Sequence, residues 1–147
     1  MRGGCDGRHK YAGDRSLNLW EPGAVMRILV VDDFGPWRSY IRSLLAERPK
    51  LEIVSEAVNG SEAVQKAEEL QPDLILMDVT LPRMNGLEAA ERIRKVSPNS
   101  KMLFVSVESA TEIMEAARRV GAQGFIPKAE ARSKLLPAIE ALNSNHR

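Results

Sequence analysis

The sequence has little cysteine, almost no net charge and no long apolar run, and each absence excludes a class of protein. Its single cysteine, Cys5, cannot form an internal disulfide, and with two histidines, His9 and His146, it offers no zinc-site spacing. The 21 Lys+Arg and 20 Asp+Glu leave a formal charge of +1, so the positive surplus typical of nucleic-acid-binding proteins is missing. No segment is apolar enough for a signal peptide or a membrane span. We therefore expect a cytoplasmic protein that binds neither nucleic acid nor membrane directly.

The first 25 residues differ in composition from the rest of the 147-residue chain. They are rich in glycine and charge, and they lack periodic apolar residues. Their four Lys+Arg and three Asp+Glu account for the whole net charge, because the remainder balances at 17 against 17. We predict a flexible N-terminal extension over residues 1–25 and one domain over residues 26–147, which is long enough to bury its own core.

From Met26 onward, short apolar runs alternate with helical patterns. Continuous apolar runs predict three central parallel strands covered on both faces, and a mixed run and a short run predict two edge strands. The central strands span residues 28–31, 74–77 and 102–105, and the edge strands span residues 51–58 and 124–126. Between them, apolar residues recur every three or four positions. This periodicity predicts five helices, over residues 37–45, 64–70, 87–93, 113–120 and 135–142.

Five β-α units in succession define the expected fold class. Because β-α-β crossovers are right-handed and helices must cover both faces, the economical arrangement is a doubly wound α/β fold. We predict a flavodoxin-like, five-stranded parallel sheet in the order 2-1-3-4-5 with five helices. The crevice of such a sheet lies at the carboxyl ends of its first and third strands.

Polar side chains stand where the predicted strands end. Asp32 and Asp33 follow the first strand, Asp78 follows the third, Ser106 follows the fourth, and Lys128 stands just after the fifth. Three neighbouring carboxylates would repel one another unless a cation lies among them, and oxygen ligands favour Mg²⁺ or Mn²⁺. Lys128 can neutralise phosphate oxygens, Ser106 can donate a hydrogen bond, and Asp78, on the central strand, can act as the nucleophile. The set predicts phosphoryl chemistry.

Some of these residues also have structural interpretations. Asp33 stands ahead of Pro36 and can cap the next helix. Phe125 fits a core position as well as a switch position, and Trp37 fits core packing or a lid beside the acidic pair. Gly86 fits the turn into the helix over residues 87–93, since no phosphate-binding glycine pattern surrounds it.

The chain contains several short motifs whose order and spacing resemble those of the receiver domains of two-component response regulators. The resemblance runs from Arg27 to about Leu142. It rests on Val31-Asp32-Asp33, Leu76-Met77-Asp78-Val79-Thr80-Leu81-Pro82-Arg83-Met84-Asn85-Gly86, Val105-Ser106 and Gly124-Phe125-Ile126-Pro127-Lys128. Asp32-Asp33-Phe34-Gly35-Pro36-Trp37, with Lys128-Ala129, is similar to receivers that precede LuxR-type output domains.

The resemblance implies a role for each motif residue. Asp78 would accept a phosphoryl group from a phosphohistidine of a sensor histidine kinase or a phosphotransfer protein. Mg²⁺ would be bound by Asp33, Asp78 and the backbone carbonyl of Thr80, with Asp32 acting through water. Lys128 would contact the phosphoryl group, Ser106 would hydrogen-bond to it, and Phe125 would be the aromatic switch.

The expected output is a change of surface rather than turnover of a substrate. Only five residues follow Leu142, so we expect no output domain and no enzymatic activity beyond the protein's own phosphorylation and dephosphorylation. The face built from residues 113–120, 124–126 and 135–142 would bind an output protein, or a second copy in a homodimer.

Other functions remain as alternatives. A Mg²⁺-dependent phosphatase of the haloacid dehalogenase type also uses a strand-end aspartate, but it needs a second aspartate two residues later, where Thr80 stands. A receiver that acts as a phosphorylation-independent interaction module is the other alternative, and the intact acidic set argues against it.

Overall fold

Five parallel strands form one sheet in the order β2-β1-β3-β4-β5 in the computed structural model, which describes residues 24–144. The strands are β1 (Met26–Val31), β2 (Leu51–Ala57), β3 (Leu74–Met77), β4 (Lys101–Ser106) and β5 (Gly124–Pro127). The helices are α2 (Gly35–Leu45), α3 (Gly60–Leu70), α4 (Gly86–Val96), α5 (Thr111–Arg119) and α6 (Ala131–Ser144). The predicted strand order and the five predicted helices are therefore confirmed. Apart from its last two residues, the predicted extension lies outside the described residues.

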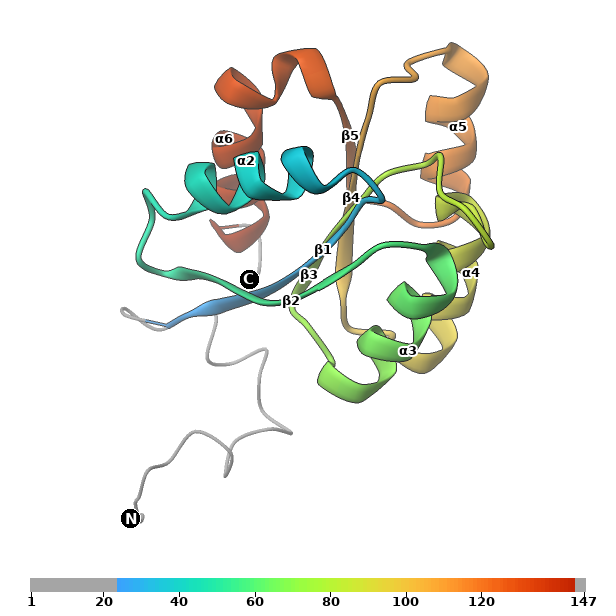
Figure 1. The fold of residues 1–147 in the computed structure, drawn as a ribbon, viewed down its shortest axis with the longest axis horizontal. Coiled ribbons are helices and arrows are strands. Elements are labelled where there is room, and N and C mark those ends of the chain that lie inside the picture. Colours follow the sequence, from blue (N-terminus) through green and yellow to red (C-terminus); the bar gives the residue numbers. More distant parts are fainter. Residues whose placement is uncertain (1–23, 145–147) are drawn as a thin grey trace.

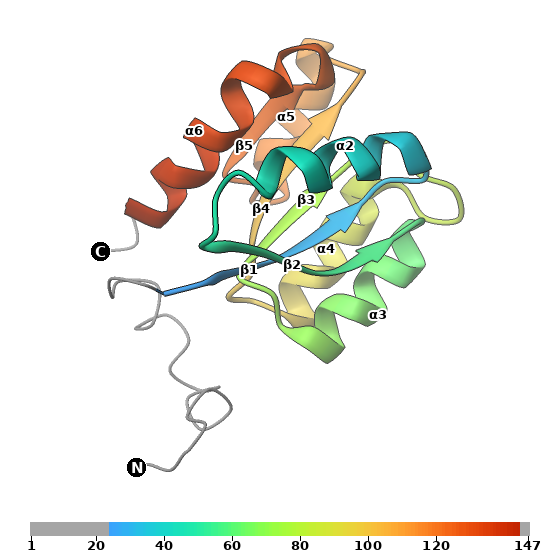
Figure 2. The same ribbon diagram turned by 60° about the vertical axis from the view of Figure 1, so that its left-hand side comes forward.

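Helices cover both faces of the sheet. Figures 1 and 2 show α2 and α6 on one face and α3, α4 and α5 on the other. Along β1, Ile28 and Val30 pack into the core under α2 and α6, while Leu29 and Val31 pack into the core under the other three helices. Because successive side chains of a strand point to opposite faces, a continuous apolar run is what a strand buried on both faces requires.

Local capping residues set where two helices begin. Asn59 caps α3, and its Oδ1 accepts a hydrogen bond of 2.7 Å from the Glu62 amide. The Glu62 carboxylate turns back to accept from the Val58 amide at 2.8 Å, one residue before the cap. Asn85 caps α4 in the same way, accepting from the Glu88 amide at 2.9 Å. A side-chain acceptor at this position satisfies an amide that has no partner within the helix.

A short 3₁₀ turn, η2 (Lys128–Glu130), joins β5 to α6 and has no counterpart among the predicted elements. It begins at Lys128, so the lysine stands at the junction of sheet and turn. No peptide bond within residues 24–144 is cis, which includes the bond between Lys128 and Ala129.

Gly86 lies where the loop after β3 meets the start of α4. Its amide donates to the Val79 carbonyl at 2.7 Å, and a Cβ atom built on it would stand 2.1 Å from the Asp78 carbonyl oxygen. Only a residue without a side chain fits this approach. Gly86 therefore packs the start of α4 directly against the backbone of Asp78.

Within residues 24–144, no helix combines the length and the apolar character needed to cross a membrane.

Candidate functional site

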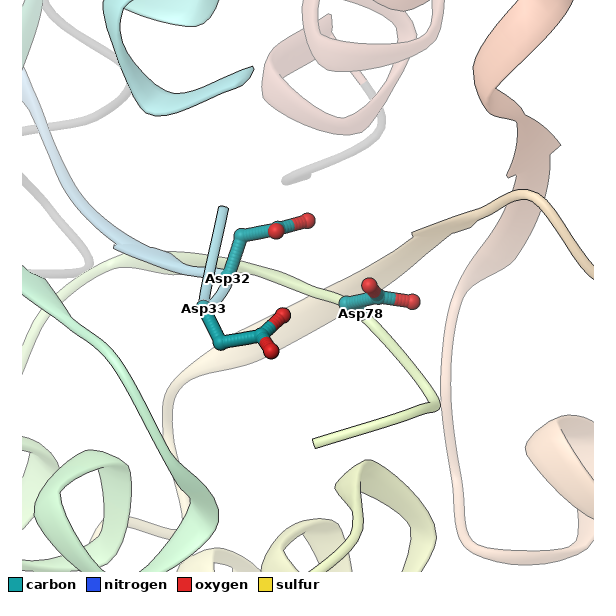
Figure 3. A group of neighbouring side chains, drawn as sticks. All are labelled: Asp32, Asp33 and Asp78. Carbon is teal, nitrogen blue, oxygen red and sulfur yellow. The ribbon is translucent and has the colours of Figure 1, made fainter. Parts of the chain in front are cut away.

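Three aspartates meet at the carboxyl edge of the sheet. Asp32 and Asp33 follow β1, and Asp78 follows the neighbouring strand β3. One carboxylate oxygen from each lies within 4.8 Å of the others (Figure 3). Asp32 and Asp78 are 1% and 5% exposed, whereas Asp33 is open to solvent. Buried, mutually repelling carboxylates at this spacing suit a hard divalent cation.

Lys128 brings a positive charge to the same edge from the start of η2. Its Nζ lies 2.7 Å from Asp32 Oδ2 and 3.4 Å from Asp78 Oδ2, and its side chain is only 13% exposed. The predicted convergence of Lys128 with the acidic residues is therefore observed. In this arrangement the ammonium partly offsets the repulsion between the two buried carboxylates.

The environment of Asp32 is mixed. Burial raises the pKa of its carboxyl, and the charge of Asp78 adds to the rise, while the Lys128 ammonium and the Phe34 amide act against it. The Phe34 amide donates to Oδ1 at 2.9 Å. The buried Oδ2 has its ion pair with Lys128 but accepts no well-directed hydrogen bond from the described residues. It is an oxygen with spare capacity to bind a ligand or a water.

Asp33 is not the helix cap, so that interpretation is wrong. The N-cap of α2 is Phe34, which makes no side-chain hydrogen bond, and Pro36 stands in the first turn. Pro36 has no amide hydrogen to satisfy, which lowers the need for a cap. The exposed carboxylate of Asp33 therefore remains next to Asp78 without a capping role.

Two other predicted residues occupy the same edge. Ser106 is the last residue of β4, is fully buried, and pairs across the sheet with Pro127, next to Lys128. Its Oγ accepts a hydrogen bond from the Glu108 amide at 3.2 Å. The Thr80 amide donates to Asp78 Oδ1 at 3.3 Å, so the loop after β3 curls around the Asp78 carboxylate.

Phe125, the predicted switch residue, lies near the start of β5, three residues before Lys128. Its ring is half-buried and packs against the core under α3, α4 and α5. It also lines a surface groove with Met114 and Arg118 of α5. Core and switch interpretations of Phe125 are both compatible with this position.

Behind Asp32 and Asp33 lies a group of ion-paired residues that was not predicted from the sequence. We call this group, Arg38, Arg42 and Glu56, the brace. Arg38 of α2 donates to the Asp32 carbonyl at 2.7 Å and to Glu56 Oε1 at 3.0 Å. Arg42, one turn further on, also pairs with Glu56, which stands near the end of β2. The four-residue spacing of Arg38 and Arg42 was the available signal, since it places both on one face of a helix. The brace ties the backbone of Asp32 to the neighbouring strand.

Glu56 makes stability depend on pH. Burial opposes its ionisation, but hydrogen bonds from Arg42 and Arg38 outweigh it and hold its pKa below the ordinary 4.5. The ionised form therefore stabilises the fold above pH 4.5, and this contribution is lost as pH falls through the folded-state pKa. We expect Glu56→Gln to lower the free energy of unfolding at pH 7 by about 1 kcal/mol and to flatten its decline between about pH 5 and 3.

Urea unfolding across this pH range tests the Glu56 prediction. Glu52→Gln is the matched control, because Glu52 is an exposed glutamate of the same strand. Its pH profile should follow that of the unmodified protein. Parallel profiles for the unmodified protein and Glu56→Gln would show that the brace contributes no pH-dependent stability.

A doubly wound parallel sheet with an acidic cluster and a lysine at its carboxyl edge defines a class of phosphoryl-handling α/β domains. Within that class, the chain belongs to the response regulator receiver domain family, whose model matches residues 28–140. The phosphoacceptor signalling role of receivers fits the site described above, and neither alternative function is favoured.

Sequence similarity to other proteins supports the assignment to the receiver domain family. Chemotaxis protein CheY of Thermotoga maritima is 38% identical over 117 residues, which is 80% of this chain and 94% of that protein. The protein-glutamate methylesterase/protein-glutamine glutaminase of Alkalilimnicola ehrlichii is 43% identical over 105 residues, which is 70% of this chain but only 27% of that protein. The chain thus spans about a quarter of the length of that enzyme.

Solved structures agree with the sequence relatives. A LuxR-family two-component response regulator from Aurantimonas sp. SI85-9A1 has a TM-score of 0.79 at 32% identity, covering 84% of this chain and 89% of that one. The response regulator domain of Thermotoga maritima CheB has a TM-score of 0.76 at 34% identity, covering 82% and 97%. The similarity to LuxR-type receivers expected from the motifs is therefore confirmed.

Proposed function

We propose that Asp78 is the phosphoacceptor of a two-component phosphorelay, receiving its phosphoryl group from a phosphohistidine of a sensor histidine kinase or a phosphotransfer protein. The observation that carries this proposal is the position of the Asp78 carboxylate. It is buried at the centre of the sheet edge, 3.4 Å from the Lys128 ammonium and within 4.8 Å of oxygens of Asp32 and Asp33.

In the proposed reaction, an oxygen of Asp78 supplies the electron pair for a new bond to phosphorus. The bond between phosphorus and the donor nitrogen breaks, and its electrons leave with the imidazole. Charge on the phosphoryl oxygens is met by the Lys128 ammonium, and Ser106 donates a hydrogen bond to one of them. Catalysis here consists mainly of positioning and neutralisation, because the phosphoryl group itself carries the reactivity.

Receiver domains bind Mg²⁺ at an acidic pocket, and the acidic cluster here fits that ion. Oxygen ligands from carboxylates and carbonyls are those that Mg²⁺ and Mn²⁺ prefer. The buried Asp32 Oδ2 is paired with the Lys128 ammonium but accepts no well-directed hydrogen bond from the described residues. The proposed ligands are Asp33, Asp78 and the Thr80 backbone carbonyl, with Asp32 binding through water. When bound, the cation neutralises negative charge shared by the carboxylates and the phosphoryl group.

The proposed output is a shift between two conformations of one face. Once Asp78 is phosphorylated, Ser106 moves toward β3 with its loop, and Phe125 turns inward beside α5. This changes the surface of α5, β5 and α6, which an output protein or a second copy of the chain then reads. The burial of Ser106 at the end of β4 and the half-buried ring of Phe125 support this sequence of events.

The protein acts in this proposal as a switch, not as an enzyme that turns over a separate substrate. A haloacid dehalogenase-type phosphatase needs a second aspartate where Thr80 stands. The exposed Thr80 side chain has no carboxyl group and cannot act as the general acid.

The cytoplasmic location stays a prediction from the sequence, as does the extent of the domain over residues 26–147.

Mass spectrometry after treatment with a small phosphodonor tests the proposal. We expect one phosphoryl group per chain, located in the peptide that contains Asp78, when Mg²⁺ is present. Without Mg²⁺, labelling should fall by on the order of tenfold or more, because the carboxylates then repel the anionic donor. Sustained release of phosphate from a small substrate, without a labelled aspartate, would instead favour the phosphatase.

A further inference from the structure

The Lys128 ammonium has a third kind of neighbour besides the two carboxylates. Its Nζ lies 4.8 Å from the centre of the Trp37 ring, over the indole face. Asp32 follows β1, Asp78 follows β3, and Trp37 stands in the first turn of α2. The ammonium is therefore held from two separate segments of the chain, residues 32–37 and the loop after β3.

The backbone and the ring of Trp37 are both held in place by neighbouring groups. Its amide donates to the Phe34 carbonyl at 3.0 Å, which closes the first turn of α2 behind Pro36. The half-buried ring packs on the core under α2 and α6, and the Tyr40 ring lies 5.2 Å away at 40°. Trp37, Asp32 and Asp78 surround the same gap in the packing at the carboxyl edge of the sheet, which is too small to hold a water molecule.

The indole contributes something that the carboxylates cannot. A lysine side chain is a flexible four-carbon stem, so its ammonium must be restrained to act at one place. The carboxylates of Asp32 and Asp78 attract it, but a bound cation or phosphoryl group changes the charge that they present. A cation over an aromatic face is attracted by the ring quadrupole, which such ligands leave unchanged.

We propose that Trp37 is a positioning residue for phosphoryl transfer: its indole face holds the Lys128 ammonium beside Asp78 while the charges of the acidic cluster change. The inference rests on the proposed function, since it assigns Trp37 to the same reaction. Trp37 itself touches neither the phosphoryl group nor Asp78 in this proposal and acts only through Lys128.

The test is the initial rate of Asp78 labelling by a small phosphodonor at saturating Mg²⁺. We expect Trp37→Leu to slow labelling roughly fivefold, which corresponds to the loss of one partly desolvated cation–π contact. The rate of Trp37→Phe should lie between that of Trp37→Leu and that of the unmodified protein. In a Lys128→Ala background, Trp37→Leu should have no further effect on the rate. A packing role would slow that background as well, so the comparison separates the two roles.

Tyr40→Leu is the matched packing control. It removes the tilted ring that packs beside Trp37 but keeps the indole face that lies under Lys128, so labelling should stay within about twofold of the unmodified rate. Urea unfolding shows whether each variant is folded under the assay conditions. Where Trp37→Leu is not, Trp37→Phe carries the test, because it keeps an aromatic ring in the core.

Fluorescence supplies a readout other than phosphorylation. The chain has two tryptophans, Trp20 and Trp37, so Trp20→Phe leaves Trp37 as the only one. Addition of Mg²⁺ alone should change the Trp37 emission saturably as the ammonium adjusts to the bound ion. When Trp20→Phe is combined with Lys128→Ala, Mg²⁺ should cause much less change in the Trp37 emission. An undiminished change in emission would contradict the proposed contact.

Two different results would overturn two different statements. If the unmodified protein takes no phosphoryl group on Asp78, the proposed function fails. If the unmodified protein is labelled on Asp78 and folded Trp37→Leu is labelled at the same rate, the proposed function stands and the role of Trp37 fails.

Discussion

Replacement of Asp78 by asparagine is expected to abolish phosphodonor labelling, with a fall of at least about a hundredfold in the initial rate. Asparagine has nearly the shape of aspartate, but its amide offers no anionic oxygen to attack phosphorus. In the unmodified protein the label should be stable to acid and labile to hydroxylamine, as expected of an acyl phosphate. Measurement of both properties, together with the labelled peptide, identifies the group that carries the phosphoryl.

The fold should survive this substitution. Asp78→Asn removes one of two buried, repelling carboxylates, while Lys128 keeps its closer partner, Asp32, at 2.7 Å. We expect the free energy of unfolding to stay within about 1 kcal/mol of the unmodified value. Loss of labelling in a folded variant therefore reports on chemistry.

Asp73→Asn is the matched control for Asp78→Asn. Asp73 precedes β3 at the opposite end of the same strand, where its carboxylate accepts from the Arg27 amide at 2.8 Å. This substitution should lower stability but leave labelling of the folded protein in place. Labelling that persists in Asp78→Asn and disappears in Asp73→Asn would refute the assignment of the phosphoacceptor.

Replacement of Gly86 by alanine is expected to destabilise the protein strongly. The new Cβ would stand 2.1 Å from the Asp78 carbonyl oxygen, far inside the van der Waals contact of a non-bonded carbon and oxygen, so the loop or the start of α4 must move. We expect a loss of at least about 3 kcal/mol and a melting temperature roughly 10 °C lower. Differential scanning calorimetry measures both effects.

The Gly86 substitution should also disturb chemistry, because the displaced backbone is that of Asp78 itself. At a temperature where the variant is folded, we expect labelling to be slower by on the order of tenfold or more. Gly35→Ala is the matched control, since its Cβ would meet nothing closer than the Arg38 guanidinium at 3.7 Å. That change should alter stability by no more than about 0.5 kcal/mol. Equal stabilities for the two variants would contradict the close approach at Gly86.

Most of the fold was predictable because its signals are local. Burial on both faces requires a continuous apolar run, and burial on one face of a helix requires apolar residues every three or four positions. The predicted strand over residues 51–58 differs from β2 by one residue, since Val58 already belongs to the turn before α3. The 3₁₀ turn at Lys128 escaped prediction because three residues carry no periodicity.

The acidic cluster was predictable for a different reason. Parallel strands end at one edge, so residues that follow β1 and β3 must approach each other whatever their side-chain conformations. This places Asp32, Asp33 and Asp78 together from the strand order alone. Lys128 follows the edge strand β5, so the order brings it to the same edge without indicating which carboxylate it pairs with.

The sequence by itself determined the strand order, the acidic edge and the family of the protein, because apolar periodicity and motif spacing are properties of the chain. Only the tertiary structure decided the partners within that edge. Lys128 lies closer to Asp32 than to Asp78 and over the face of Trp37, and Arg38 joins the Asp32 backbone to Glu56. Apart from the contact between Arg38 and Asp32, these contacts join segments far apart in the chain. They depend on how helices cross the sheet and on which rotamers the packed core allows, and a local sequence pattern encodes neither.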